Sequence, residues 1–118
     1  MSKDEEVFSR IVKRTQQIYD STVHLVRVNT PGDFQRDQVV KDYMDKFAKK
    51  VGLKNYTINV YNDLTIEEGI IRFSDAINAD MIAMATHGRS GFAHVIAGSV
   101  AEDVANHSKR PVLTFVVK

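Results

Sequence analysis

The run Met81-Ile82-Ala83-Met84-Ala85 constrains the fold most, because five consecutive apolar residues lead directly into a glycine-containing loop. A short, continuous apolar run is typical of a strand that is covered on both faces. Strands of this kind belong to parallel sheets, in which the crossover connections place helices over the sheet. The run therefore predicts an α/β fold.

Helix and strand patterns alternate along the whole chain. A Ser2–Glu5 capping box, followed by apolar residues at helical spacing, predicts a helix at the start of the chain. The apolar residues are Val7, Phe8, Ile11, Val12, Ile18 and Tyr19. The patterns that follow predict a strand Thr22–Val28, a helix stopped by Gly52, an edge strand over 56–61, a helix capped by Thr65 with Glu68, the strand Met81–Ala85, a helix opened by Ser99 with Glu102, and the strand Val112–Val117. We therefore expect one domain over residues 1–118, an open parallel sheet of four strands with helices on both faces.

The segment between the third strand and the last helix has the spacing of a phosphate-binding loop. Ala85-Thr86-His87-Gly88 is followed after nine residues by Gly98-Ser99. Gly88 lacks a Cβ and lets the backbone approach an anion, while Gly98 and Ser99 stand where a helix begins. The same glycines would also serve an ordinary turn, so the spacing alone leaves both readings open.

This segment resembles the C-terminal half of a universal stress protein domain. The resemblance is carried by residues 81–91, by Gly98-Ser99-Val100-Ala101-Glu102-Asp103-Val104 and by Arg110-Pro111-Val112-Leu113. ATP-binding members of that family carry Gly, two residues, Gly, nine residues, then Gly-Ser or Gly-Thr. Gly88 and Gly98-Ser99 match this pattern, whereas Ala85 stands at the first glycine, where its methyl group crowds the phosphate path.

The resemblance also implies a sheet of five parallel strands in the order 3-2-1-4-5, whose central first strand precedes the first helix. Only residues 1–3 stand at that place here, so we expect a domain without this strand and without the family's adenine-contacting Asp. The neighbouring strands then either pair directly or accept a strand from another chain. The second adenine contact of the family corresponds to Val28.

The function implied by the resemblance is a non-catalytic stress-response domain with a degenerate adenine-nucleotide site. ATP, accompanied by Mg²⁺, or AMP is the expected ligand. The expected nucleotide-binding residues are Val28, Ala85, Thr86, His87, Gly88, Arg89, Gly98, Ser99 and Val100. The alternative is a nucleotide-free interaction or dimerisation module, and an ATP hydrolase is disfavoured because no residue is placed to activate water. A homodimer is expected through the apolar last strand, Val112–Val117.

Composition and charge exclude several other classes. The 118 residues contain no Cys, which excludes thiolate catalysis and cysteine-based metal sites, and no histidine has a metal-ligand spacing. Sixteen Lys and Arg against fifteen Asp and Glu give no field that favours nucleic acid. No apolar run approaches the roughly 20 residues of a membrane span, and we expect a cytoplasmic protein.

Overall fold

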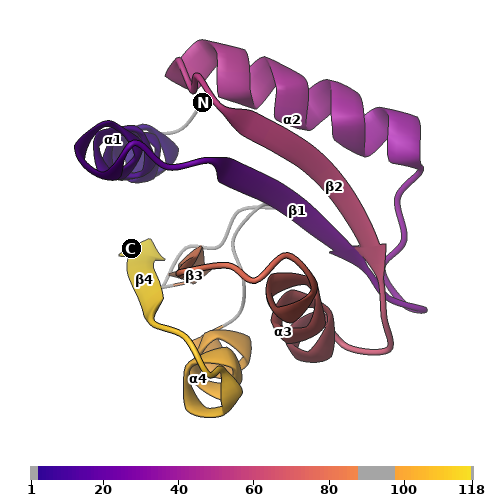
Figure 1. Cartoon of the computed structure of the whole chain (residues 1–118). Helices are drawn as coiled ribbons and strands as arrows, with labels where there is room; N and C mark the ends of the chain where they lie inside the picture. The colour runs from indigo at the N-terminus through magenta and orange to yellow at the C-terminus, as the bar shows by residue number, and fades with distance from the viewer. Residues whose placement is uncertain (1–2, 88–97, 118) are drawn as a thin grey trace. The chain divides into compact units, whose positions relative to one another are not determined.

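The computed structural model describes residues 3–87 and 98–117, in which helices and strands alternate (Figure 1). The elements are α1 (Lys3–Tyr19), β1 (Val23–Asn29), α2 (Asp37–Val51), β2 (Tyr56–Asn62), α3 (Ile66–Ala76), β3 (Ile82–His87), α4 (Gly98–His107) and β4 (Val112–Val117). Their order confirms the predicted α/β class. The chain divides into two compact units, Met1–Asp63 and Leu64–Lys118.

The first unit contains a parallel pair of strands. β1 and β2 run in register from Val23 opposite Tyr56 to Asn29 opposite Asn62. β2 pairs with β1 alone among the described strands, which agrees with the edge position expected from its alternating sequence. A small core joins α2 to this sheet, and it consists of Ala48, Val51 and Leu53 with Val12, Val23, Leu25, Phe47 and Tyr56 packed around them.

The end of α2 forms as its sequence predicts. Gly52 has a φ of 83°, and its backbone N–H donates to the carbonyl of Ala48 at 2.9 Å. Glycine adopts this left-handed conformation without the steric penalty of a Cβ, which ends the helix. A Cβ at Gly52 would also lie 3.2 Å from Nζ of Lys13 on α1. That ammonium therefore stands at the C-terminal end of the α2 dipole, where a cation is favourable.

α1 is less buried than its apolar pattern predicts. Ile18 and Tyr19, two residues of the apolar pattern, are 64% and 74% exposed. The buried residues of the described part of this helix are polar ones, Ser9 and Gln16. Periodicity identifies the apolar face of a helix, but it cannot show whether another element covers that face.

The second unit contains the other parallel pair. β3 and β4 run in register from Ile82 opposite Val112 to His87 opposite Val117. Helix α3 begins as predicted, because Oγ1 of Thr65 accepts the backbone N–H of Glu68 at 3.1 Å. The fourth helix differs from its prediction. It already includes Gly98, so Ser99 lies inside the first turn and is not the N-cap residue.

β3 also differs from the strand expected over Met81–Ala85. It begins at Ile82, continues to His87, and alternates in exposure over its first residues. Ile82 and Met84 are buried, whereas Ala83 and the preceding Met81 are exposed. The continuous apolar run therefore does not have both faces covered in this part of the strand.

The four strands do not form one ladder among the described residues. They form two separate two-stranded sheets, β1 with β2 and β3 with β4. The predicted open sheet of four strands, with helices on both faces, is not confirmed. A single four-stranded sheet requires that a strand of one pair also pairs, along its second edge, with a strand of the other pair. None of the described strands does so.

Candidate functional site

The predicted site residues fall at the carboxyl ends of strands, in two parts. Val28 lies near the end of β1 and is 8% exposed. The next residue, Asn29, is 2% exposed. Its side-chain amide donates to the carbonyl of Gln35, and its Oδ1 accepts the N–H of Gln35, both at 3.1 Å, which closes the loop after β1. The strand end that carries Val28 is thus held by a buried, satisfied amide.

The same loop is held a second time by Arg27. Its Nη2 donates to Oδ1 of Asp33 at 2.8 Å and to the Asp33 carbonyl at 3.2 Å. Thr30 and Asp33 exchange two backbone hydrogen bonds across the turn. The roles of Asn29 and Arg27 in this loop were not predicted from the sequence. A polar residue that ends an apolar strand before Thr-Pro-Gly was the available signal for Asn29.

The other part of the site belongs to the second unit. Ala85, Thr86 and His87 form the end of β3, and Gly98, Ser99 and Val100 form the first turn of α4. Gly88 and Arg89 lie outside the described residues. Only four residues separate the end of α4 from the start of β4. The first residue of β4 pairs with the first residue of β3, and α4 packs on both strands. Helix α4 therefore runs back along the sheet, which brings its N-terminus to the carboxyl end of β3.

This arrangement provides the backbone chemistry of an anion site. The first N–H groups of a helix have no partner within the helix, and the dipole places positive charge at that end. A phosphate at the carboxyl end of a parallel strand is recognised in this way. Ser99 is exposed in this first turn, and a hydroxyl is available there as a further donor.

The far end of α4 is attached to α3 by a charged hydrogen bond. Nδ1 of His107 lies 2.5 Å from Oε1 of Glu67. The hydrogen bond to Glu67, with the charge of that carboxylate, raises the pKa of His107 above its ordinary value of 6.5. Glu67 lies in the first turn of α3 and His107 in the last turn of α4, so each charge also suits its own helix dipole.

Arg110 holds the connection between α4 and β4 against the end of α3. Its side chain is 15% exposed, and its guanidinium donates to the carbonyl of Ala79, to Oγ of Ser74 and to the carboxylate of Asp75. The planar fork of arginine suits several acceptors at fixed directions. Sequence analysis missed this contact, since its partners lie more than 30 residues away.

A second polar cluster joins α2 to β2. Asp45 accepts the hydroxyl of Tyr56 and pairs with Lys49, each at 2.8 Å. Its hydrogen bonds from Lys49 and Tyr56 lower the pKa of Asp45, and the bond to Asp45 raises the pKa of Tyr56. Both shifts move the pKa of the group further from neutral pH. The cluster is therefore suited to holding the two elements together and not to proton transfer near neutral pH.

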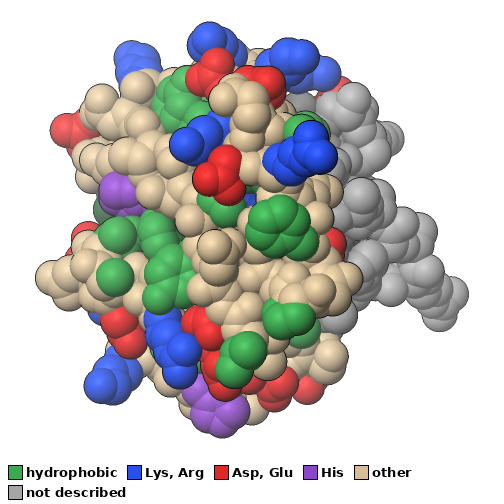
Figure 2. All heavy atoms as spheres, turned by 90° about the vertical axis from the view of Figure 1, so that its right-hand side faces the viewer, with side chains coloured by type: hydrophobic (Ala, Val, Ile, Leu, Met, Phe, Trp, Pro, Cys, Tyr) green, Lys and Arg blue, Asp and Glu red, His purple; other side chains and the backbone are tan. Residues whose placement is uncertain are grey.

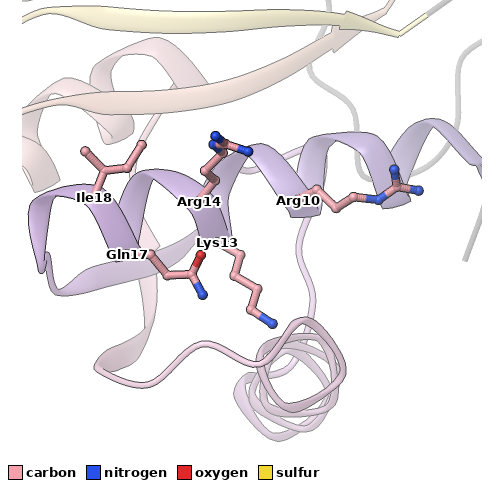
Figure 3. Close-up of a pocket in the computed structure, with 5 residues that line it drawn as sticks. All are labelled: Arg10, Lys13, Arg14, Gln17 and Ile18. Carbon is pink, nitrogen blue, oxygen red and sulfur yellow. The ribbon is translucent and has the colours of Figure 1, made fainter.

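A shallow cavity of about 430 Å³ lies along α1, lined by Arg10, Lys13, Arg14, Gln17 and Ile18. Figure 3 shows that the three cationic side chains leave the helix in different directions. Their charges do not converge on one point, so the cavity is not an anion site. The face in Figure 2 likewise shows positive and negative side chains intermixed.

Two further features concern metals and membranes. Within residues 3–87 and 98–117, no three His, Asp or Glu side chains gather as a metal site would require. None of the helices in the described part of the chain is both long enough and apolar enough to cross a membrane.

Comparison with known proteins connects this geometry to a family. The sequence profile of the universal stress protein family matches residues 2–116. A universal stress protein of Methanocaldococcus jannaschii is 35% identical over 68 residues, which are 58% of this chain and 39% of that protein. The chain spans less than half the length of the curated relatives that it matches.

Solved structures show the same fold at low sequence identity. A universal stress protein in complex with cAMP has a TM-score of 0.72 and 18% identity, with 99% of this chain and 90% of that chain covered. The universal stress protein of Archaeoglobus fulgidus in complex with dAMP has a TM-score of 0.68 and 18% identity, with 97% and 89% covered.

Proposed function

Because this chain belongs to the universal stress protein family, we propose that it is a non-catalytic stress-response domain with a degenerate adenine-nucleotide site. The ligand is ATP, accompanied by Mg²⁺, or AMP. The phosphates lie along residues 85–89 and 98–100, and Val28 is the position that corresponds to the second adenine contact of the family. A cytoplasmic location belongs to the same proposal.

The observation that carries this proposal is the N-terminus of α4 at the carboxyl end of β3. The first N–H groups of α4, which have no partner within the helix, and the helix dipole together offer a phosphate hydrogen bonds and positive charge. Two structures of similar fold were solved with adenine nucleotides, cAMP and dAMP, which supports an adenine ligand at a fold of this kind.

The site is degenerate because of Ala85. This residue occupies the first glycine position of the phosphate loop, and a Cβ there takes space that a glycine would leave to the anion. We therefore expect weak binding, which replacement of the methyl group by hydrogen should strengthen.

Calorimetric titration with ATP and Mg²⁺, and separately with AMP, tests the proposal. We expect Gly88→Val to weaken binding at least about tenfold, since valine rarely adopts a positive φ and fills the space of the anion. Ala85→Gly should tighten binding. Gly32→Val is the matched control, because a Cβ at Gly32 meets nothing within 4 Å and this residue lies in the other unit. Equal affinity of the parent and Gly88→Val would place the nucleotide elsewhere.

A nucleotide-free interaction module is the second candidate function. It is favoured by sheet edges that have no backbone partner among the described strands, because such edges pair readily with other chains. In this reading, as in the first, the chain forms a homodimer through β4. Absence of measurable binding of ATP and AMP by the folded parent chain would favour this second function.

A further inference from the structure

Phe34 lies in the loop between β1 and α2, which Figure 1 shows at the carboxyl end of β1. The residue before it, Asp33, exchanges two backbone hydrogen bonds across the turn and accepts two more from Nη2 of Arg27. The residue after it, Gln35, has both backbone groups bonded to the buried side chain of Asn29. The backbone of Phe34 is therefore fixed to the strand end from both sides.

The side chain of Phe34 stays exposed on this fixed backbone. It is 67% exposed, although burial of a phenylalanine ring is strongly favourable. A single exposed apolar residue is ordinary by itself, but the carboxyl end of a parallel strand is where ligands bind to α/β folds. Val28 directly precedes Asn29, which bonds to Gln35, the residue after Phe34. Phe34 is therefore attached to the strand end that carries the expected adenine contact.

The chemistry of the segment Asp33–Gln35 favours a flat, apolar ligand group. The backbone N–H and carbonyl groups of Asp33 and of Gln35 are already hydrogen-bonded within the loop. The Asp33 carboxylate is paired with Arg27 at 2.8 Å, which offsets its repulsion of an anionic ligand. The segment therefore offers a ligand the face of an aromatic ring, on which a nucleic-acid base stacks.

We propose that Phe34 is a further contact of the ligand and stacks on the base of the bound adenine nucleotide, while Asn29 is the positioning residue that holds Phe34 in place. This inference rests on the proposed nucleotide binding and adds to it a side chain that recognises the base. Because the backbone on both sides of Phe34 is already fixed, the ring needs little ordering when the ligand binds.

Titration of the 118-residue chain with AMP and, separately, with ribose 5-phosphate tests the contact, because the two ligands differ only by the base. NMR titration measures both affinities. We expect Phe34→Ala to weaken AMP at least about fivefold and to leave ribose 5-phosphate unchanged. Phe34→Tyr keeps an aromatic face and should bind AMP within about twofold of the parent. Val39→Ala, at a 57% exposed position of α2, is the matched control and should bind both ligands normally.

A double-mutant cycle tests the positioning role of Asn29. Asn29→Ala removes both bonds to Gln35 and should weaken AMP at least about threefold, with ribose 5-phosphate unchanged. In the Phe34→Ala chain the same change should have almost no further effect on AMP, because Asn29 acts through the ring. Asn59→Ala is the matched control, since the amide of Asn59 on β2 also makes two hydrogen bonds, and it should bind AMP normally.

Equal affinity of the parent and Phe34→Ala for AMP would overturn the inference and leave nucleotide binding itself intact. Equal weakening of AMP and ribose 5-phosphate by Phe34→Ala would also overturn it, because the ring would then not act through the base. An undiminished effect of Asn29→Ala in the Phe34→Ala chain would refute the positioning role. A folded parent chain that binds neither ATP nor AMP would instead contradict the proposed function, and this inference with it.

Discussion

Gln16 connects three backbone groups of the first unit. Its Nε2 donates to the carbonyls of Ser21 and Asn55 at 2.9 and 2.8 Å, and its Oε1 accepts the N–H of Lys54 at 3.2 Å. The residue is 8% exposed, so water cannot readily replace these bonds. The side-chain amide of Gln16 therefore links α1 to the start of both strands.

We predict that Gln16→Leu lowers the free energy of unfolding by about 2 kcal/mol, because three backbone groups each lose a hydrogen bond while the side-chain volume is nearly retained. Urea denaturation measures the change. Gln17→Leu, one residue further and exposed, should stay within about 0.5 kcal/mol of the parent. Equal losses in the two variants would show that the buried hydrogen bonds of Gln16 do not matter.

The pair of His107 and Glu67 makes the second unit sensitive to pH. Folding raises the pKa of His107 above 6.5, so the contribution of this pair to stability is complete below that value. It is lost as the pH rises through the raised pKa of the folded state. We predict that Glu67→Gln lowers the pKa of His107 in an NMR titration, whereas Glu68→Gln leaves it nearly unchanged. An unaltered His107 titration in Glu67→Gln would contradict the observed pairing.

Arg110 attaches the segment between α4 and β4 to the end of α3. A lysine has one ammonium group and cannot reproduce the directions of the guanidinium bonds to Ala79, Ser74 and Asp75. We predict that Arg110→Lys costs about 1–3 kcal/mol of stability, measured by thermal or urea unfolding. Lys109→Ala, at an exposed neighbouring position, should have little effect.

The elements were predictable where local residues determine them. The stop at Gly52 and the cap at Thr65 need only neighbours within four residues, and both form as expected. The sequence could not predict which side chains other elements cover, nor which residues far apart in the sequence are in contact. The exposure of Ile18 depends on what lies beside α1, and the contacts of Arg110 depend on residues far away in the sequence.

The candidate site was likewise predictable only where neighbouring residues determine it. The spacing from Ala85 to Ser99 predicts a loop between a strand and a helix, and the structure has β3 and α4 at its two ends. Ser99 was wrongly placed at the N-cap because a capping-box pattern also occurs inside a first turn. The buried Asn29, which fixes the strand end beside Val28, needed the folded loop to be recognised.

The last strand, β4, is the expected dimer contact. β4 pairs with β3 and has a second edge that none of the described strands occupies. We predict that Val116→Asp shifts the mass measured by light scattering toward the monomer, because a charge on an apolar edge opposes pairing. Val39→Asp, at a position of α2 that is 57% exposed, should leave the mass unchanged. A parent chain that is already monomeric would refute a β4 dimer.

We propose above that this member of the universal stress protein family binds an adenine nucleotide. Native mass spectrometry of the chain, as purified and after addition of ATP with Mg²⁺ or of AMP, tests it most directly. We expect one nucleotide bound per chain, with greater occupancy in Ala85→Gly and loss of binding in Gly88→Val. A folded chain that carries no nucleotide under any of these conditions, in the parent and in Ala85→Gly alike, would contradict it.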